Sequence, residues 1–310
     1  MAASLLAGTP PLKAGADPVA PPQQNTPFFS GQGLDSYGLS QDGSNAEMQW
    51  IKTNTQLHVF GLYIGGNVNA DVLHRPGAGG WYRLNDLQSQ GWKFAPIWTA
   101  YTATNGICSM TTGAASNSGW SEGLAAAERG YQAGLAPEGL IYLDLEPYVG
   151  HMADGLNGQC TWAYFYYISA WLQAVATSSY HFAGGLYASP AWINIYRTKA
   201  NAYGSYVGNA VSIWFARWGT NSQSWNGQIW TGDVSPTNSN YSGDPTVGTG
   251  SIPTGVWEYQ RARQFKGDTS LWTGSRSRVV DGNCWKGPVY AHWNSFPGFL
   301  SPNSYPQHGC

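Results

Sequence analysis

Short apolar runs alternate with helix-like segments along most of this chain of 310 residues. A brief run rich in β-branched and aromatic residues, followed by a longer segment with helical spacing, is typical of a βα unit. Repeated βα units build a parallel sheet, and eight of them can close into a (β/α)8 TIM barrel, which is the α/β fold predicted here. The eight predicted strands are Phe28–Ser36, His58–Gly65, Trp92–Tyr101, Gly139–Pro147, His181–Ser189, Ser212–Trp218, Gly255–Arg261 and Arg278–Asp281.

The segments between these runs carry helix signals. Ser44 and Glu47 form the capping-box pattern that opens a helix. An open doubly wound sheet also fits the alternation, but it usually carries a glycine-rich phosphate loop after its first strand. Residues 33–37, Gly-Leu-Asp-Ser-Tyr, lack that spacing, so the closed barrel is favoured. Further helices are predicted at Trp81–Gln90, Ser118–Ala133, Thr161–Thr177 and Ala191–Ala202.

One domain is expected to hold the whole barrel, over residues 28–288. Residues 1–27 are rich in Pro and Ala and should form a loose leader. Residues 289–310 should form a tail packed on the barrel. The segment Asn221–Thr254 has no apolar period, so it is expected to be a long irregular loop before the seventh strand.

Charged residues are scarce and aromatic residues are abundant. Charged residues make up 10% of the chain, the net charge is −2 and no basic run occurs, so a nucleic-acid surface is not expected. The 16 Trp and 19 Tyr suit a protein that stacks rings on sugars, although about two-thirds of them should fill the core. No apolar run reaches about 18 residues, so membrane insertion is not expected either. We expect a monomer.

The four cysteines allow three pairings if all are oxidised. The preferred pairing joins neighbours along the chain, Cys108 with Cys160 and Cys284 with Cys310. No C-x-x-C or H-E-x-x-H pattern supports a metal site, and no cofactor is expected. Two disulfides favour a secreted or cell-envelope protein, whose signal peptide has been removed or never existed.

The sharpest motif is the segment Gly139–Tyr148, which contains the sequence Asp-Leu-Glu at residues 144–146. Side chains alternate along a strand, so Asp144 and Glu146 should point into the barrel at its C-terminal end, where barrel enzymes place their active sites. Two carboxylates so close oppose each other's ionisation, which should raise one pKa toward the range of a general acid. A protonated acid beside an ionised partner is what cleavage of a glycosidic bond requires.

Further acidic and amide residues fall at other predicted strand ends. Asp35 ends the first strand and Asp281 the eighth, which are neighbours in a closed barrel. Glu258 or Gln260 lies near the end of the seventh strand, depending on register. The alternative is a purely structural role, in which these carboxylates bind only backbone amides or a distant Arg. Their placement at several separate strand ends favours an active site instead.

Eight short segments occur in order between about Phe28 and Pro288: Phe28–Asp35, Gly61–Gly66, Gly91–Trp98, Ile141–Tyr148, Gly184–Ser189, Ile213–Trp218, Gln260–Phe265 and Val279–Gly282. Together these segments resemble the glycoside-hydrolase-like domain of actinobacterial secreted proteins, a domain of unknown function.

That family is similar to the muramidases of glycoside hydrolase family 25, whose barrels carry acidic residues on strands one and eight and a D-x-E on strand four. The resemblance implies that Glu146 is the general acid and that Asp144 stabilises the reacting ring or orients a substrate acetamido group. It implies that Asp35 and Asp281 position water and substrate and tune Glu146. The expected substrate-binding residues are Tyr63, Trp98, Tyr148, Tyr187, Trp218, Trp257, Glu258 and Gln260.

The predicted function is therefore cleavage of a cell-envelope polysaccharide, by default peptidoglycan, while an arabinan or galactan stays open. A carbohydrate-binding protein on the same barrel, without turnover, is the alternative. An amide-cleaving hydrolase is not favoured, because the sequence shows no Cys–His, Ser–His or zinc constellation. The pattern G-x-S-x-G at residues 119–123 lacks the preceding strand that a nucleophile elbow needs, because Thr111–Ser118 looks like a polar loop.

Overall fold

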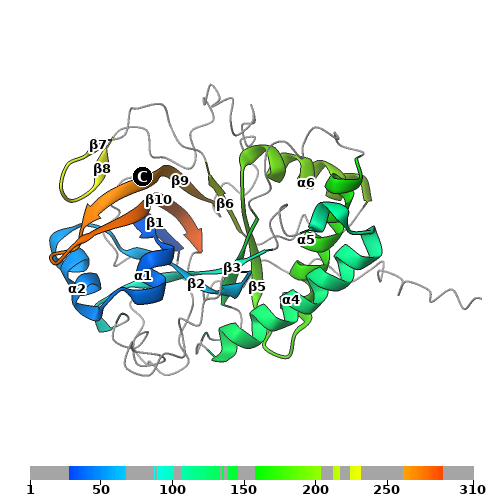
Figure 1. Cartoon of the computed structure of the whole chain (residues 1–310), viewed down its shortest axis with the longest axis horizontal. Coiled ribbons are helices and arrows are strands. Elements are labelled where there is room, and N and C mark those ends of the chain that lie inside the picture. The colour runs from blue at the N-terminus through cyan, green and yellow to red at the C-terminus, as the bar shows by residue number, and fades with distance from the viewer. Residues whose placement is uncertain are drawn as a thin grey trace, which may run out of the picture.

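The computed structural model describes residues 28–67, 87, 89–100, 106–132, 135, 139–145, 158–203, 212–216, 224–231 and 261–288. Eight strands close into one barrel in the order β1-β10-β9-β6-β5-β4-β3-β2, so the predicted single-domain barrel is confirmed (Figure 1). The expected leader 1–27 and tail 289–310 lie outside the described residues. The barrel strands are β1 Phe28–Asp35, β2 Val59–Gly66, β3 Lys93–Thr99, β4 Leu140–Asp144, β5 Ala183–Ala188, β6 Ser212–Ala216, β9 Arg261–Trp272 and β10 Ser277–Pro288.

The barrel is mixed rather than wholly parallel, which corrects the expected sheet. Strand β10 runs antiparallel to both β1 and β9, and a short turn without a helix joins β9 to β10 as a hairpin. The expected seventh strand, Gly255–Arg261, shares only Arg261 with β9, and its other residues lie outside the described ones. Strand β9 combines polar residues with Gly267 and Asp268, a composition that masked a strand in the sequence.

The described helices are α1 Tyr37–Asp42, α2 Asn45–Asn54, α4 Thr112–Gln132, α5 Gln159–Thr177 and α6 Pro190–Tyr203. Helix α2 opens with the predicted capping box of Ser44 and Glu47. Helix α4 begins well before the predicted Ser118, so the expected polar loop is helical. The G-x-S-x-G pattern therefore lies inside a helix, where no nucleophile elbow exists.

Two separate cores fill the molecule. The outer core lies between the strands and the helices, and α4 and α5 supply much of it. Gly119 and Gly123 let these two helices approach closely, because a Cβ at Gly119 would lie 2.1 Å from the carbonyl oxygen of Tyr167. The inner core fills the barrel lumen with Val59, Ala95, Ile97, Leu140, Tyr142, Tyr187, Trp214, Ala262 and Trp285.

A second, small hairpin occupies part of the expected irregular loop Asn221–Thr254. Strands β7 Ser224–Trp225 and β8 Trp230–Thr231 pair antiparallel, and the remaining residues of that loop lie outside the described ones. The Gln32 side chain of β1 accepts from the backbone N–H of Trp230 at 2.9 Å and donates to its carbonyl at 2.7 Å. The Trp230 ring packs on Phe265 of β9, so this hairpin covers the outer face of β1 and β9 in place of a helix.

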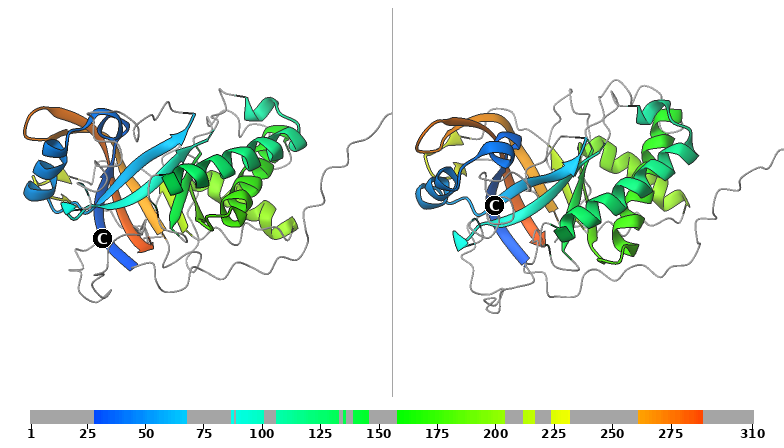
Figure 2. Two further views of the ribbon diagram at one scale, coloured as in Figure 1. Left: turned by 90° about the horizontal axis from the view of Figure 1, so that it is seen from below. Right: turned by 60° about the horizontal axis from the view of Figure 1, so that its bottom comes forward.

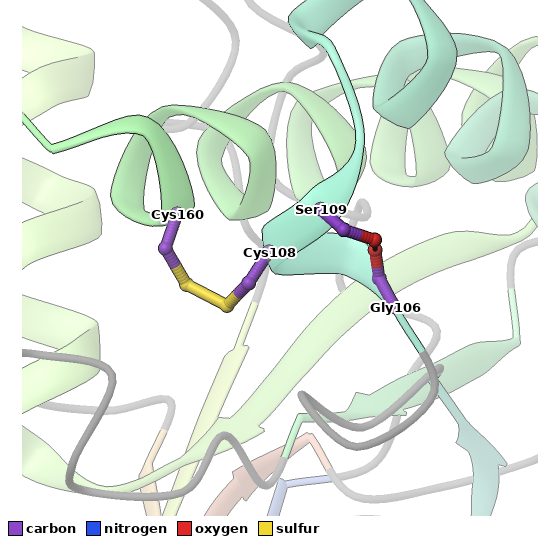
Figure 3. Close-up of a disulfide and its surroundings, with 4 residues drawn as sticks. All are labelled: Gly106, Cys108, Ser109 and Cys160. Atoms are coloured by element: carbon purple, nitrogen blue, oxygen red, sulfur yellow. Dashed lines mark hydrogen bonds between the residues drawn. A yellow bond between two sulfur atoms is a disulfide. The ribbon is translucent and has the colours of Figure 1, made fainter.

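A disulfide joins Cys108 to Cys160, as predicted (Figure 3). Cys108 lies in the short helix η3 Ile107–Ser109 and Cys160 in the first turn of α5, so the bond ties the entrance of α4 to α5. Cys284 is disulfide-bonded as well, and its expected partner Cys310 lies outside the described residues. None of the helices in the described part of the chain is long and apolar enough to cross a membrane.

Candidate active site

Asp35 and Asp281 lie side by side at one end of the barrel lumen. They are paired across β1 and β10, and Asp35 is 2% exposed. The side-chain amide of Gln264 on β9 donates to both carboxylates, at 3.3 Å to Asp35 Oδ2 and 3.2 Å to Asp281 Oδ2. The two predicted residues therefore lie together, as expected, and one neutral donor bridges them.

A second amide positions Asp35 from the neighbouring strand. Asn283 of β10 donates through Nδ2 to Asp35 Oδ2 at 2.6 Å and to the carbonyl of Asp281 at 3.0 Å. Its oxygen accepts from the indole Nε1 of Trp214 at 2.9 Å, and Asn283 is fully buried. Because the indole is only a donor, it fixes which end of the Asn283 amide faces Asp35.

Gln264 is oriented in the same way. Its Oε1 accepts from the hydroxyl of Tyr187 on β5 at 2.9 Å, which leaves its NH2 group for the two carboxylates. The expected substrate-binding residue Tyr187 is 6% exposed and packs edge-on against Trp214 with the ring centroids 5.1 Å apart. The structure thus gives Tyr187 a definite role in holding the acidic cluster.

Asp144 ends β4 on the lumen side. It is 4% exposed, and its register partners are Thr99 on β3 and Tyr187 on β5. Leu143 and Leu145 belong to the outer core, whereas Tyr142 belongs to the lumen, so the alternation predicted for this strand holds over the described residues. Glu146 and Tyr148 lie outside the described residues.

The rim beside Asp35 is aromatic. The hydroxyl of Tyr63 on β2 lies 3.4 Å from Asp35 Oδ1, which brings this expected substrate-binding residue to the cluster. The exposed ring of Tyr37 meets Tyr63 edge-on, with the centroids 5.8 Å apart. Gly61 leaves room for the Asp35 side chain, because a Cβ at Gly61 would lie 2.4 Å from Asp35 Cβ.

Trp98 lies on the other face of the sheet, which corrects its expected place at the mouth. Its indole packs over Gly65 and donates to Glu122 of α4 at 3.1 Å, and the hydroxyl of Tyr167 donates to the same carboxylate at 2.6 Å. Burial raises the pKa of Glu122, against the lowering effect of these two hydrogen bonds. The alternation along β3 explains the position, since Ile97 fills the lumen and Trp98 points outward.

The remaining predicted binding residues, Trp218, Trp257, Glu258 and Gln260, lie outside the described residues. Gln264 and Asn283 were not predicted as site residues. Each is a polar residue on a strand between buried neighbours, and that pattern was the available signal. In the described ranges, no three His, Cys, Asp or Glu side chains gather as a metal site would require.

Carboxylates from β1, β4 and β10 thus lie at the same end of a lumen that contains the aromatic side chains Tyr142, Tyr187, Trp214 and Trp285. Buried carboxylates fixed by neutral amide and hydroxyl donors are suited to proton transfer and to stabilising positive charge on a ligand. The fold and this arrangement define a glycoside-hydrolase-like barrel.

The chain belongs to the family described as the Rv2525c-like, glycoside hydrolase-like domain, whose model matches residues 49–285. This confirms the family resemblance seen in the sequence. No curated protein matches the chain.

Three solved structures are among those to which the chain is similar. An uncharacterized B. stearothermophilus protein is 17% identical with a TM-score of 0.48, covering 81% of this chain and 94% of its own. The Tat-secreted protein Rv2525c of Mycobacterium tuberculosis, in complex with L-tartrate, is 15% identical with a TM-score of 0.48, covering 85% and 98%. A muramidase from Trichobolus zukalii is 15% identical with a TM-score of 0.41, covering 83% and 93%.

Proposed function

We propose that this protein is a glycoside hydrolase that cleaves a cell-envelope polysaccharide, with peptidoglycan as the first substrate to test. The observation that carries the proposal is the placement of Asp35, Asp144 and Asp281 at the same end of the barrel lumen, on three strands that are not consecutive in the sequence. Membership of a glycoside-hydrolase-like family supports the same reaction class.

Each carboxylate has a proposed role. Glu146, two residues beyond Asp144, donates a proton to the leaving sugar oxygen. Asp144 stabilises the positive charge that develops on the sugar ring, or orients an acetamido group that attacks the anomeric carbon. Asp35 and Asp281 hold water and substrate in place from the opposite side of the lumen. No cofactor takes part in this scheme.

A secreted or cell-envelope location follows from the same proposal. The Cys108–Cys160 disulfide forms and persists in an oxidising compartment, and a polysaccharide substrate of the envelope lies there as well. We propose that the protein acts there as a monomer, without a nucleic-acid partner and without membrane insertion.

A carbohydrate-binding protein without turnover is the second candidate. Asp281 favours it, because Oδ1 accepts from the backbone N–H of Asp268 at 2.6 Å while Oδ2 accepts from Gln264. A carboxylate with both oxygens engaged is well suited to shaping a binding site and less free to exchange protons.

The test is release of reducing ends from purified peptidoglycan, arabinogalactan, chitin and plant glycans. We expect the wild type to cut at least one glycan and Glu146→Gln to lose about a hundredfold or more of that activity, as loss of a general acid does. Glu128→Gln is the matched control, since Glu128 is an exposed glutamate on α4 away from the lumen. Glycans that bind both proteins equally but are never cut would establish the binding protein instead.

A further inference from the structure

The hairpin of β9 and β10 continues beyond the end of the barrel on the side of the acidic cluster. Asp281 pairs with Asp35, the last residue of β1, so residues 277–280 of β10 extend past the barrel strands. They stay paired with β9, Ser277 with Trp272 and Val279 with Ser270. We call residues 266–272 and 277–280 the arm. Its tip lies beside α2 in Figure 1, and Figure 2 shows it projecting next to the blue helices.

One face of the arm continues the lumen face of β10. Asp281 points to the lumen side, and because side chains alternate along a strand, Val279 and Ser277 share that face. Partners in an antiparallel pair also share a face, which places Trp272 beside Ser277. The exposed fractions agree, since Trp272 is 51% and Val279 62% exposed, whereas Leu271 and Val280 between them are buried.

The opposite face of the arm is firmly held. Arg278 donates to Glu47 of α2 at 2.9 and 3.0 Å, and Thr273 donates to the same carboxylate at 3.0 Å. The hydroxyl of Ser36, which directly follows Asp35, donates to the carbonyl of Val279 at 2.7 Å. Trp272 is therefore an exposed indole on a strand whose backbone is held in place, about 14 Å along the strand from Asp281.

An indole on such a strand serves as a stacking surface at little entropic cost. The apolar face of a sugar ring is the ligand chemistry that stacks on an indole while its hydroxyl edges stay in water. The arm is continuous with the acidic cluster and with the exposed rim residue Tyr37, so one glycan chain can contact all of them.

We propose that Trp272, with Val279 beside it, is a remote binding subsite for a glycan chain whose other end lies over Asp35 and Asp281. The inference rests on the proposed function and specifies it: the ligand is a polymer several sugars long rather than a short glycoside. Affinity then rises with chain length until the chain reaches Trp272.

The experiment measures binding of peptidoglycan glycan strands of graded length, and of intact sacculi, to proteins carrying Glu146→Gln so that nothing is cut during the assay. We expect Trp272→Ala to bind long strands and sacculi about tenfold more weakly than the parent, and to lose the rise of affinity with length. Trp272→Tyr should keep most of the parent's affinity for long strands. Trp120→Ala is the matched control, since Trp120 is an exposed (40%) tryptophan on α4, and we expect it to bind like the parent.

Several results would overturn the subsite: equal binding by Trp272→Ala and the parent, equal weakening by Trp120→Ala, or no binding of any strand by the parent. A change from dimer to monomer on Trp272→Ala in sedimentation would also overturn it, because a second copy of the chain would then cover the arm. The two proposals fail separately. If long strands bind through Trp272 but the wild type never cuts them, the subsite is supported and the hydrolase is ruled out. If the wild type cuts glycans and Trp272→Ala changes neither binding nor cutting, the hydrolase is supported and the subsite is ruled out.

Discussion

The two halves of the barrel wall are held in place by different forces. Strands β3 to β6 lie under α4, α5 and α6, and apolar side chains and close helix contacts fix that half. Strands β9, β10 and β1 have the β7–β8 hairpin and the arm instead, and a buried ion-pair cluster around Glu47 fixes the arm. The hairpin half supplies Asp35, Gln264, Asp281 and Asn283 to the site. The polar site is therefore built mainly where the regular βα pattern ends.

The helix-covered half should lose stability when the close contact between α4 and α5 is disturbed. A Cβ at Gly119 would lie 2.1 Å from the Tyr167 carbonyl oxygen, and neither backbone can retreat without moving a whole helix. We expect Gly119→Ala to lower the free energy of unfolding by about 3 kcal/mol or more, measured by urea unfolding.

Gly113→Ala is the control on the same helix. Nothing lies within 4 Å of a Cβ at Gly113, so replacing that glycine should leave stability unchanged or raise it by up to about 1 kcal/mol. If both variants lose the same free energy, the close approach of α4 and α5 is not what fixes this half.

The hairpin half should respond instead to charge. Glu47 is 3% exposed, and its carboxylate accepts hydrogen bonds from Arg278, Arg276 and Thr273. The two guanidinium groups, Arg278 above all, hold the pKa of Glu47 well below its usual range against the raising effect of burial. Glu47→Gln should therefore cost about 3 kcal/mol at neutral pH, because Arg278 keeps Asp42 but loses its buried partner.

The pH dependence of this loss has a definite sign. Since the folded-state pKa is lowered, the stabilisation is complete above the ordinary glutamate pKa and is lost as the pH falls through the folded-state value. The gap in stability between wild type and Glu47→Gln should thus narrow below about pH 4.5, and Glu128→Gln should show no such gap. If the stability difference between wild type and Glu47→Gln stays constant below pH 4.5, the ion pairs of Glu47 are not its cause.

The helix-covered half of the barrel could be predicted from the sequence far better than the hairpin half. Helical spacing and apolar runs predicted β2 to β6, the capping box at Ser44 and the D-x-E strand, because each of these signals is local. The alternation of residues 142–145 placed Asp144 in the lumen correctly. Trp98 was misplaced, since a strand end alone does not reveal which face a bulky residue takes when both faces are buried.

The hairpin half could not be predicted in the same way. Strand β9 bulges twice opposite Gly282, so its period of two is broken where Gln264, Phe265 and Lys266 pass from lumen to arm. The arginine partners of Glu47 lie more than 200 residues away in the chain, and no local pattern predicts such a contact. Gln264 and Asn283 became visible as site residues only through their shared acceptor Asp35.

The smallest expected effect lies where the two halves meet, at the amino ends of β2 and β3. Lys52 of α2 lies 2.6 Å from Nδ1 of His58 and beside the ring of Trp92. Burial, together with the charge of Lys93 nearby, lowers the pKa of Lys52 to about 8, and burial lowers the pKa of Lys93 to about 8. The aliphatic parts of both lysines are packed here, and the same burial disfavours the charged form of their ammonium groups.

These two lysines should make the protein more stable as the pH rises. Between about pH 8 and the unfolded value of 10.5, the unfolded chain still binds both protons while the folded chain has released them. The free energy of unfolding should increase by about 1 kcal/mol for each lysine from about pH 8 to pH 9. The double variant Lys52→Met, Lys93→Met should lack this increase, and urea unfolding of both proteins at the two pH values measures it. An equal change in both proteins would show that other titrating groups, and not the burial of these two lysines, cause the increase.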